Sequence, residues 1–224
     1  MITLILVGGN SQRFLNAGYT KPKCLLPMPN YATMLEWVVQ ALPCQRVVIA
    51  GREAHRSVLE VGVYDAYRWL VGAEKISMVW GEGKARGPLY GVLDARECLQ
   101  SVTPLLVAYC DVIPLFSVGD ALHVWQGAES GAVTFPSHDP RFGYWDGERV
   151  REKEAVSDRA VSGLFYFAST LETVKRAEAI AYDGAGIVHL LNAQTRMYEV
   201  SAREILDLGT PEAYEAFMGE GVRA

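Results

Sequence analysis

Short runs of apolar residues alternate with amphipathic stretches along most of this 224-residue chain. The apolar runs have the length of buried strands, and the amphipathic stretches have the spacing of helices with one buried face. Repetition of strand, helix and strand predicts a three-layer α/β protein, in which helices cover both faces of a mainly parallel sheet. We expect the strands at Ile2–Val7, Arg46–Ala50, Ser77–Trp80, Leu105–Tyr109, Gly131–Phe135 and Val161–Phe167.

Four segments carry the signals that begin a helix. Thr33-Met34-Leu35-Glu36 has the spacing of a capping box. Pro88 suits a first helical turn, and the helix that follows it is expected to bear Leu89, Val92, Leu93 and Leu99. Ser117 through Trp125 has a helical pattern, and Thr210-Pro211-Glu212 joins a cap, a first-turn proline and an acid at the positive end of the helix dipole.

The alternating pattern changes after Gly131. Phe142–Trp145 and Val150 flank an Asp146-Gly147 pair, which is typical of a hairpin turn. We therefore expect a small antiparallel insertion around Phe142–Phe167, lying beside the main sheet. No internal repeat, low-complexity tract or linker interrupts the sequence, so residues 1–224 are interpreted as a single domain.

The composition and charge of the chain argue against several classes of protein. A net charge of −5, without a basic run interleaved with aromatic residues, argues against nucleic acid as a partner. The cysteines, Cys24, Cys44, Cys98 and Cys110, show no C-x-x-C spacing and are expected to be free thiols in a reducing cytoplasm. The apolar N-terminal run is too short to span a membrane. We expect a soluble, cytoplasmic protein without a membrane partner; a homo-oligomer remains open.

The first 27 residues carry the strongest chemical signal. An apolar run ends at Gly8-Gly9-Asn10-Ser11-Gln12-Arg13, and Lys21-Pro22-Lys23 follows. Two glycines let backbone amides approach an anion closely, Arg13 offers a planar fork of donors, and Lys23 offers a point charge. This combination suits a polyphosphate. Neither a Walker A loop nor a G-x-G-x-x-G dinucleotide fingerprint fits the segment.

A buried strand further along ends in a carboxylate, Asp111. Ligands of open α/β sheets bind beyond the carboxyl ends of strands, and magnesium prefers oxygen ligands together with substrate phosphates. Asp111 is therefore a candidate metal ligand. A turn cap before Pro114 is the alternative role that its position allows.

The opening segment also carries a family resemblance. Its pattern G-G-x-x-x-R-F, followed by K-P-K-x-L-x-P, resembles the start of the nucleotidyltransferases that activate sugar phosphates. Arg13-Phe14-Leu15-Asn16-Ala17-Gly18-Tyr19-Thr20-Lys21-Pro22-Lys23 is most similar to the capsular and surface-polysaccharide branch. The resemblance implies a Rossmann-like, nucleotide-diphospho-sugar transferase-like fold. It also implies magnesium-dependent transfer of NMP from an NTP to a sugar 1-phosphate or similar acceptor, with release of pyrophosphate.

The same resemblance assigns roles to individual residues. Arg13 and Lys23 become catalytic, and the nucleotide is bound by Gly8, Gly9, Asn10, Ser11, Gln12 and, against the base, Gly87. Asp207, in a segment similar to D-x-G-T-P-E-x-Y, joins Asp111 as a ligand for Mg²⁺. An E-K segment and a following G-x-Y-x-F strand make Glu152, Lys153 and Gly163 acceptor-binding residues, and Tyr109 and Trp145 are candidates to line the acceptor pocket.

Departures from the family pattern keep other functions open. Ser11 and Gln12 replace the glycine and threonine of the commonest loop, and Pro88 replaces a small residue. They favour a non-catalytic nucleotide-binding regulator as one alternative. A metal-dependent glycosyltransferase is another, although Asp111-Val112-Ile113 lacks the D-x-D that such enzymes normally carry. The short Gly83–Pro88 segment and the capsular resemblance favour CTP or UTP over the purine nucleotides.

Overall fold

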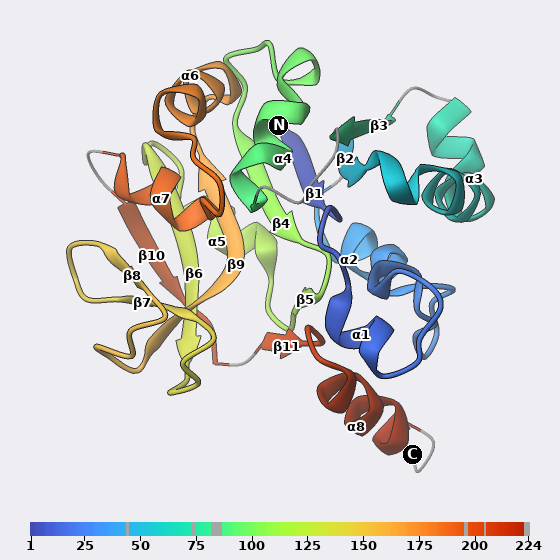
Figure 1. The fold of residues 1–224 in the computed structure, drawn as a ribbon. Helices are drawn as coiled ribbons and strands as arrows, with labels where there is room; N and C mark the ends of the chain where they lie inside the picture. Colours follow the sequence, from blue (N-terminus) through green and yellow to red (C-terminus); the bar gives the residue numbers. More distant parts are fainter. Residues whose placement is uncertain (44, 73–74, 82–86, 195–196, 204, 222–224) are drawn as a thin grey trace.

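A mainly parallel sheet forms the centre of the molecule (Figure 1). The computed structural model describes residues 1–224 except 44, 73–74, 82–86, 195–196, 204 and 222–224. The strand order is β10-β6-β9-β4-β1-β2-β3. These strands are β1 (Ile2–Leu6), β2 (Val47–Arg52), β3 (Ile76–Gly81), β4 (Leu105–Tyr109), β6 (Ser130–Pro136), β9 (Arg159–Phe167) and β10 (Met197–Ser201).

Strand β1 has a parallel partner on each side. Its register pairs Leu4 with Val48 of β2 and with Val107 of β4. Both neighbours are buried on both faces, which explains why these strands appear in the sequence as continuous apolar runs. The expected α/β fold, with its largely parallel sheet, is confirmed.

Strand β9 corrects one part of the sequence interpretation. It was expected in a small insertion beside the sheet, but it lies within the main sheet, antiparallel to both β4 and β6. All of its residues except Arg159 are buried, as a central strand requires. The hairpin itself is confirmed, and it is restricted to β7 (Gly143–Trp145) and β8 (Val150–Glu152).

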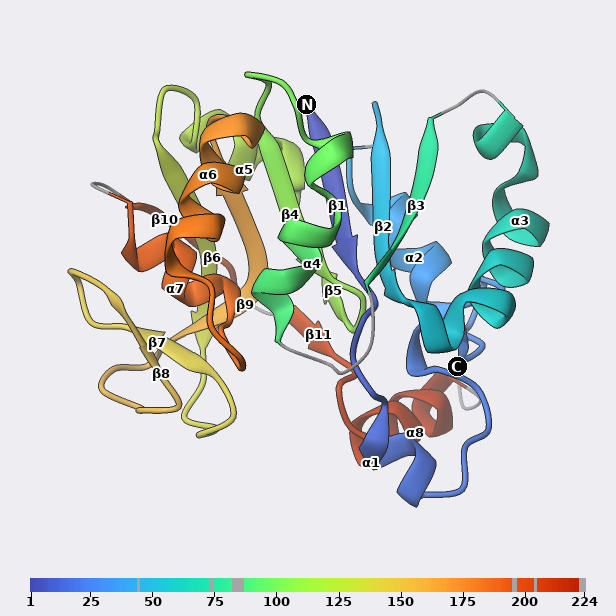
Figure 2. The same ribbon diagram turned by 45° about the horizontal axis from the view of Figure 1, so that its top comes forward.

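Helices cover the two faces of the sheet and enclose two separate hydrophobic cores (Figure 2). One core contains buried residues of α2, α3 and α5, and the other contains buried residues of α4, α6 and α7. The helices are α1 (Gln12–Asn16), α2 (Met34–Ala41), α3 (Arg56–Gly72), α4 (Pro88–Asp94), α5 (Val118–Val124), α6 (Thr170–Ile180), α7 (Ile187–Asn192) and α8 (Pro211–Gly221). None of the described helices is long and apolar enough to cross a membrane.

The predicted helix starts lie where the sequence places them. The Thr33 hydroxyl accepts a hydrogen bond from the Glu36 amide at 3.1 Å, and Pro88 occupies the first turn of α4. Helix α4 is shorter than expected, because it ends at Asp94. Leu99 follows a 3₁₀ turn instead, and it is still fully buried in the core under α4.

The last helix returns to the N-terminal segment. Helices α8 and α1 lie side by side in both views of the ribbon (Figures 1 and 2). The Tyr214 hydroxyl donates to the Pro27 carbonyl at 2.8 Å, and the Tyr214 ring packs edge-on against Phe14. A short antiparallel pair, β5 (Val112–Pro114) and β11 (Ile205–Asp207), joins this end of the chain to the end of β4.

Candidate active site

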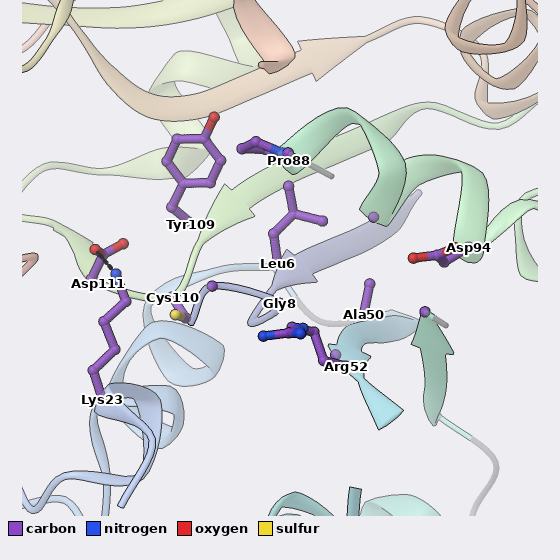
Figure 3. Close-up of a pocket in the computed structure, with 15 residues that line it drawn as sticks. Leu6, Gly8, Lys23, Ala50, Arg52, Pro88, Asp94, Tyr109, Cys110 and Asp111 are labelled. Atoms are coloured by element: carbon purple, nitrogen blue, oxygen red, sulfur yellow. Dashed lines mark hydrogen bonds and ion pairs between the residues drawn. The ribbon is translucent and has the colours of Figure 1, made fainter. Parts of the chain in front are cut away.

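A cavity of about 300 Å³ opens at the carboxyl ends of the parallel strands (Figure 3). It lies where the chain leaves β1, β2, β3 and β4, which is the place where open α/β sheets bind their ligands. Several of the residues that line the cavity are glycine or alanine, so their backbone atoms are accessible to a bound ligand. The lining residues are Leu6, Gly8, Gly9, Lys23, Ala50, Gly51, Arg52, Gly81, Gly87, Pro88, Gly91, Asp94, Tyr109, Cys110 and Asp111.

Gly8 and Gly9 line this cavity, and protein packing does not require their small size. A Cβ on Gly8 would come no closer than 3.7 Å, to the Arg52 side chain. A Cβ on Gly9 would meet no atom of the described residues within 4 Å. The space in front of both glycines is therefore open to a ligand, as an anion-binding loop needs.

Ser11 shows how the chain tolerates a departure from the usual loop. Its φ of 51° lies in the left-handed region that glycine adopts at little cost. Its hydroxyl accepts a hydrogen bond from the Lys23 backbone amide at 3.2 Å. The serine thus fixes the position of Lys23 relative to the glycine-rich loop, in return for backbone strain of about 1–3 kcal/mol.

A further arginine lies in the cavity, and the sequence motifs did not identify it. Arg52 ends β2, lines the cavity beside Gly8, and donates through Nη1 to the Asn10 side-chain oxygen. Arg52 therefore links the glycine-rich loop to the neighbouring strand. Figure 3 shows its side chain beside Gly8. Arg52 could have been identified from its position at the end of a strand only if the pairing of that strand with β1 had been known.

Four of the predicted nucleotide-site residues do not line the cavity: Asn10, Ser11, Gln12 and Arg13. Arg13 and Gln12 are exposed on α1, and Gln12 donates to Asn16 at 2.8 Å. Arg13 lines a separate hollow with Pro211 and Glu212, at the start of α8. The structure thus divides the opening motif between two neighbouring sites: the glycines and Lys23 face the cavity, and Arg13 faces α8.

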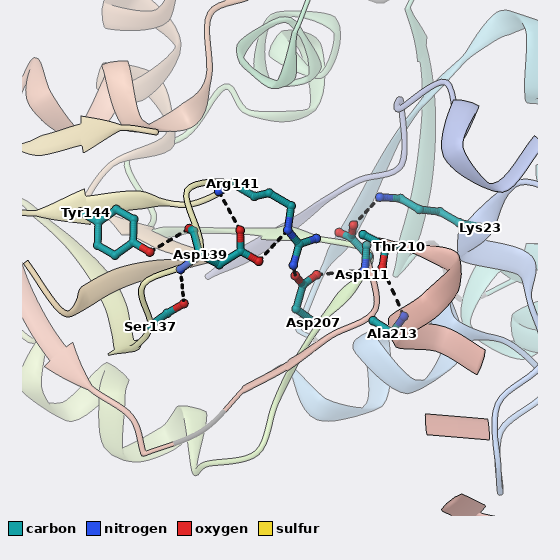
Figure 4. A network of polar contacts seen from close by, with 10 residues as sticks. Lys23, Asp111, Ser137, Asp139, Arg141, Tyr144, Asp207, Thr210 and Ala213 are labelled. Carbon is teal, nitrogen blue, oxygen red and sulfur yellow. Dashed lines mark hydrogen bonds and ion pairs between the residues drawn. The ribbon is translucent and has the colours of Figure 1, made fainter. Parts of the chain in front are cut away.

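Lys23 and Asp111 form an ion pair at the mouth of the cavity (Figures 3 and 4). Both side chains are largely buried, with 20% and 14% of their surfaces exposed. Burial alone would lower the pKa of Lys23, but the Asp111 carboxylate outweighs this effect and the pKa lies well above its usual value. Lys23 is consequently a permanent cation in this site, available to neutralise phosphate charge.

Asp207 is brought to Asp111 by the pairing of β11 with β5. The Leu208 amide donates to the Asp111 carbonyl at 2.8 Å, and the Gly209 amide donates to Asp207 Oδ1 at 2.9 Å. A Cβ on Gly209 would lie 2.9 Å from a carboxylate oxygen of each aspartate. The two carboxylates thus converge on one point, although 96 positions separate them in the sequence.

The chemistry of this pair fits a divalent cation. Burial and the nearby Asp111 carboxylate raise the pKa of Asp207, as two acids held close together do. Their oxygens are hard ligands of the kind that Mg²⁺ prefers. Among the described residues, no group of three or more histidines, cysteines and acids is arranged to hold a metal. Substrate phosphates and water would therefore have to complete the coordination shell.

Arg141 is another site residue that sequence reasoning missed. It precedes β7 and donates to Asp207 Oδ2 at 3.2 Å and to Asp139 Oδ2 at 2.8 Å. Figure 4 shows the resulting row of charged side chains, which leads from Asp139 through Arg141 and the two neighbouring carboxylates to Lys23. No local pattern indicates that these charges meet, because the members of the row come from four separate segments.

Of the predicted acceptor residues, Gly163 packs against a residue that lines the cavity, whereas Glu152 and Lys153 do not line it. Gly163 lies in a bulge of β9 with a φ of 91°, and a Cβ there would come within 2.7 Å of the Tyr109 ring. Tyr109 therefore packs on Gly163 while also lining the cavity. Burial is the main cause of the raised pKa of its hydroxyl, and the carboxylates of Asp111 and Glu152 add to it. Tyr109 thus lies between the predicted metal ligand Asp111 and the predicted acceptor residues Glu152 and Gly163.

Glu152 faces the start of α7. Its Oε2 lies 3.7 Å from His189 Nε2, and the same nitrogen is 2.5 Å from the Tyr182 hydroxyl. His189 had been given no role from the sequence. Lys153 is exposed with a φ of 59°, and Trp145 is buried in a hydrophobic core; neither side chain lines the cavity.

Gly87 is placed where the sequence predicts, at the start of α4 and in the cavity wall. Its φ is 108°, and a Cβ would approach the Ala185 carbonyl to 2.7 Å. The amide of Leu89 donates to that same carbonyl at 3.0 Å, so α4 and the 182–186 loop are in direct contact. The rest of the predicted base-facing segment, residues 83–86, lies outside the described residues.

A cavity of this form, with a glycine-rich loop, a lysine and paired carboxylates at the strand ends, is typical of a nucleotide-handling α/β protein. The chain matches the MobA-like NTP transferase domain over residues 3–200 and belongs to that family. The predicted class, a nucleotidyltransferase, is thereby confirmed. No curated protein matches the sequence.

Solved structures show the same fold. A protein from Bacillus anthracis assigned as a glucose-1-phosphate thymidylyltransferase is 14% identical, with a TM-score of 0.83 over 99% of this chain and 95% of that one. A nucleoside-diphosphate-sugar pyrophosphorylase from Vibrio cholerae is 20% identical, with a TM-score of 0.73 over 98% and 100% of the two chains. A UDP-glucose pyrophosphorylase, solved with UDP-glucose, is 16% identical, with a TM-score of 0.80 over 100% and 99%.

Proposed function

We propose that this nucleotidyltransferase joins the NMP unit of an NTP to a sugar 1-phosphate, or a similar phosphorylated acceptor, and releases pyrophosphate. One observation carries the proposal: Asp111 and Asp207 converge beside Lys23, at the mouth of a cavity whose wall is the glycine-rich loop. Solved proteins of the same fold that act on sugar nucleotides support the choice of acceptor.

In the proposed reaction, an oxygen of the acceptor phosphate attacks the α-phosphorus of the NTP. The bond between that phosphorus and the bridging oxygen breaks, and pyrophosphate leaves. Phosphoryl chemistry of this kind needs positioning and charge neutralisation more than covalent help from the protein. The amides of Gly8 and Gly9 bind the phosphates, and Lys23 stabilises the charge that develops around the α-phosphorus.

Asp111 and Asp207 are proposed to hold Mg²⁺. An ion held by these two carboxylates would supply positive charge to neutralise the phosphates. Lys23 gives up part of its interaction with Asp111 as phosphate enters, because the phosphate offers a second anion to the same ammonium group. Arg13 remains a proposed pyrophosphate ligand, and Asn10, Ser11 and Gln12 complete the loop that surrounds this leaving group.

The acceptor is proposed to bind on the other side of the cavity, against Tyr109 and the bulge at Gly163. Glu152 is proposed to accept hydrogen bonds from sugar hydroxyls, and Lys153 is proposed to meet the acceptor phosphate. Gly87 is proposed to lie against the base. We further propose CTP or UTP as the nucleotide, and a cytoplasmic role in nucleotide-sugar biosynthesis for a capsule or surface polysaccharide.

The test is pyrophosphate release from each of the four NTPs with a panel of sugar 1-phosphates and magnesium. Turnover should appear with CTP or UTP, and Asp111→Asn and Lys23→Met should lower it by about 10²–10³, the usual cost of one such electrostatic contact. Asp120→Asn is the matched control, because this exposed aspartate belongs to α5, away from the cavity. Tight nucleotide binding without any pyrophosphate release would instead favour a non-catalytic regulator.

A further inference from the structure

Arg141 is held between two carboxylates that have different surroundings. Its backbone amide and its Nε both donate to Asp139, at 2.9 and 2.8 Å. Its Nη2 donates to Asp207 Oδ2 at 3.2 Å. The Arg141 side chain is 38% exposed, while the Asp207 side chain is only 18% exposed. Arg141 therefore has a firm anchor near the surface and a longer, single contact with the buried acid.

Arg141 contacts the Asp207 oxygen that the local turn does not use. Oδ1 of Asp207 already accepts the Gly209 amide at 2.9 Å, as part of the turn that begins α8. Arg141 takes Oδ2. A divalent cation between Asp111 and Asp207 would place a double positive charge beside the guanidinium, which is bonded to the same Asp207 carboxylate. The cation and the Arg141 contact thus oppose each other.

We propose that Arg141 is the counter-ion of Asp207 in the metal-free protein and that a divalent cation displaces it. This inference rests on the proposed function, since it takes Asp111 and Asp207 as the metal ligands. Displacement needs no unfolding, because Asp139 keeps Arg141 anchored through two hydrogen bonds after the Asp207 contact opens. Arg141 is a positioning residue in this scheme, and it acts through Asp207.

The contact between Arg141 and Asp207 affects the order in which the divalent cation and the NTP bind. Without nucleotide, Arg141 and Lys23 already neutralise the two carboxylates, so a free divalent cation gains little by entering. An NTP brings the negative charge that the cation and both side chains can share. The protein therefore binds metal weakly alone and tightly together with nucleotide.

The experiment is a titration of the nucleotide-free protein with Mn²⁺, in which electron paramagnetic resonance reports the free ion. We expect Arg141→Gln to tighten Mn²⁺ binding roughly tenfold, because a like charge near the ion is removed. Arg151→Gln is the matched control: it removes the same charge from the neighbouring β7–β8 hairpin, where Arg151 pairs with Asp146 at 2.8 Å. Its Mn²⁺ affinity should remain that of the unaltered protein.

Two outcomes separate this inference from the proposed function. If Asp207→Asn leaves Mn²⁺ binding unchanged, Asp207 is not a metal ligand and the proposed function loses its metal site. If Asp207→Asn weakens binding while Arg141→Gln has no effect or weakens it, the metal site stands and the displacement by the cation is wrong. A second measurement is the rise in melting temperature on adding Mn²⁺, which should be larger for Arg141→Gln than for Arg151→Gln.

Discussion

Replacing Gly163 by alanine should both strain the backbone and push on the wall of the active site. Gly163 is buried in the β9 bulge with a φ of 91°, a conformation that L side chains rarely adopt. The new methyl group would lie 2.7 Å from Tyr109 Cδ2 and 3.4 Å from two further atoms of the same ring. That ring cannot easily withdraw, because it packs edge-on against Phe165, with the ring centroids 5.7 Å apart.

The size of the effect follows from these two causes. A residue held in a sparsely populated backbone region costs about 1–3 kcal/mol. An extra methyl group in a packed interior costs about 1–3 kcal/mol. We expect Gly163→Ala to lower the free energy of unfolding by about 4 kcal/mol, which corresponds to a fall in melting temperature of roughly 8–16 °C for a chain of this size.

Gly127→Ala separates the two causes. Gly127 has a φ of 81°, but a Cβ there would meet no atom of the described residues within 4 Å. Its cost should be that of the backbone alone, about 1–3 kcal/mol. Thermal and urea unfolding of both variants would measure the difference. A melting temperature for Gly163→Ala equal to that of Gly127→Ala would refute the reasoning, because it would mean that Tyr109 yields without cost.

Three other predictions concern the hairpin, a helix start and the metal. Asn192→Ala should destabilise the protein by about 2–4 kcal/mol in urea unfolding, because its side chain satisfies both the amide and the carbonyl of Val150, each at 2.8 Å; a loss below 1 kcal/mol would contradict this. Thr33→Ala should cost about 1 kcal/mol through the lost cap on the Glu36 amide, and Thr33→Ser should restore most of it. Chelation with EDTA should abolish pyrophosphate release, and added Mg²⁺ should restore it; turnover that survives EDTA would exclude the metal proposed at Asp111.

The fold was predictable to the extent that local patterns encode it. Strands β1 and β4 were predicted almost to the residue, since both are continuous apolar runs bounded by polar or turn residues. The helices α1, α3, α6 and α7 were not predicted. For α6 the signal was present: the Ser169 hydroxyl accepts the Glu172 amide at 3.3 Å, the same Ser/Thr-x-x-Glu cap that identified α2.

The site was predictable only where its residues follow strands. Gly8 and Asp111 come directly after β1 and shortly after β4, so their meeting at one edge follows from the parallel order. Arg52 was missed because its relevance depends on β2 lying beside β1. Arg141 was missed because the loop between β6 and β7 brings it to Asp207, and no local pattern specifies that approach.

The sequence by itself determined the class of the protein. Hydrophobic periodicity determined the α/β layers, and the glycine-rich loop with its basic residues determined the phosphate chemistry, because both depend on neighbours a few positions apart. Tertiary structure alone decided which charges meet: Lys23 with Asp111, Asp207 with Asp111 and Arg141, and Arg13 with the start of α8. These contacts depend on strand order and on the path of loops, and the energies that fix both are spread over the whole core.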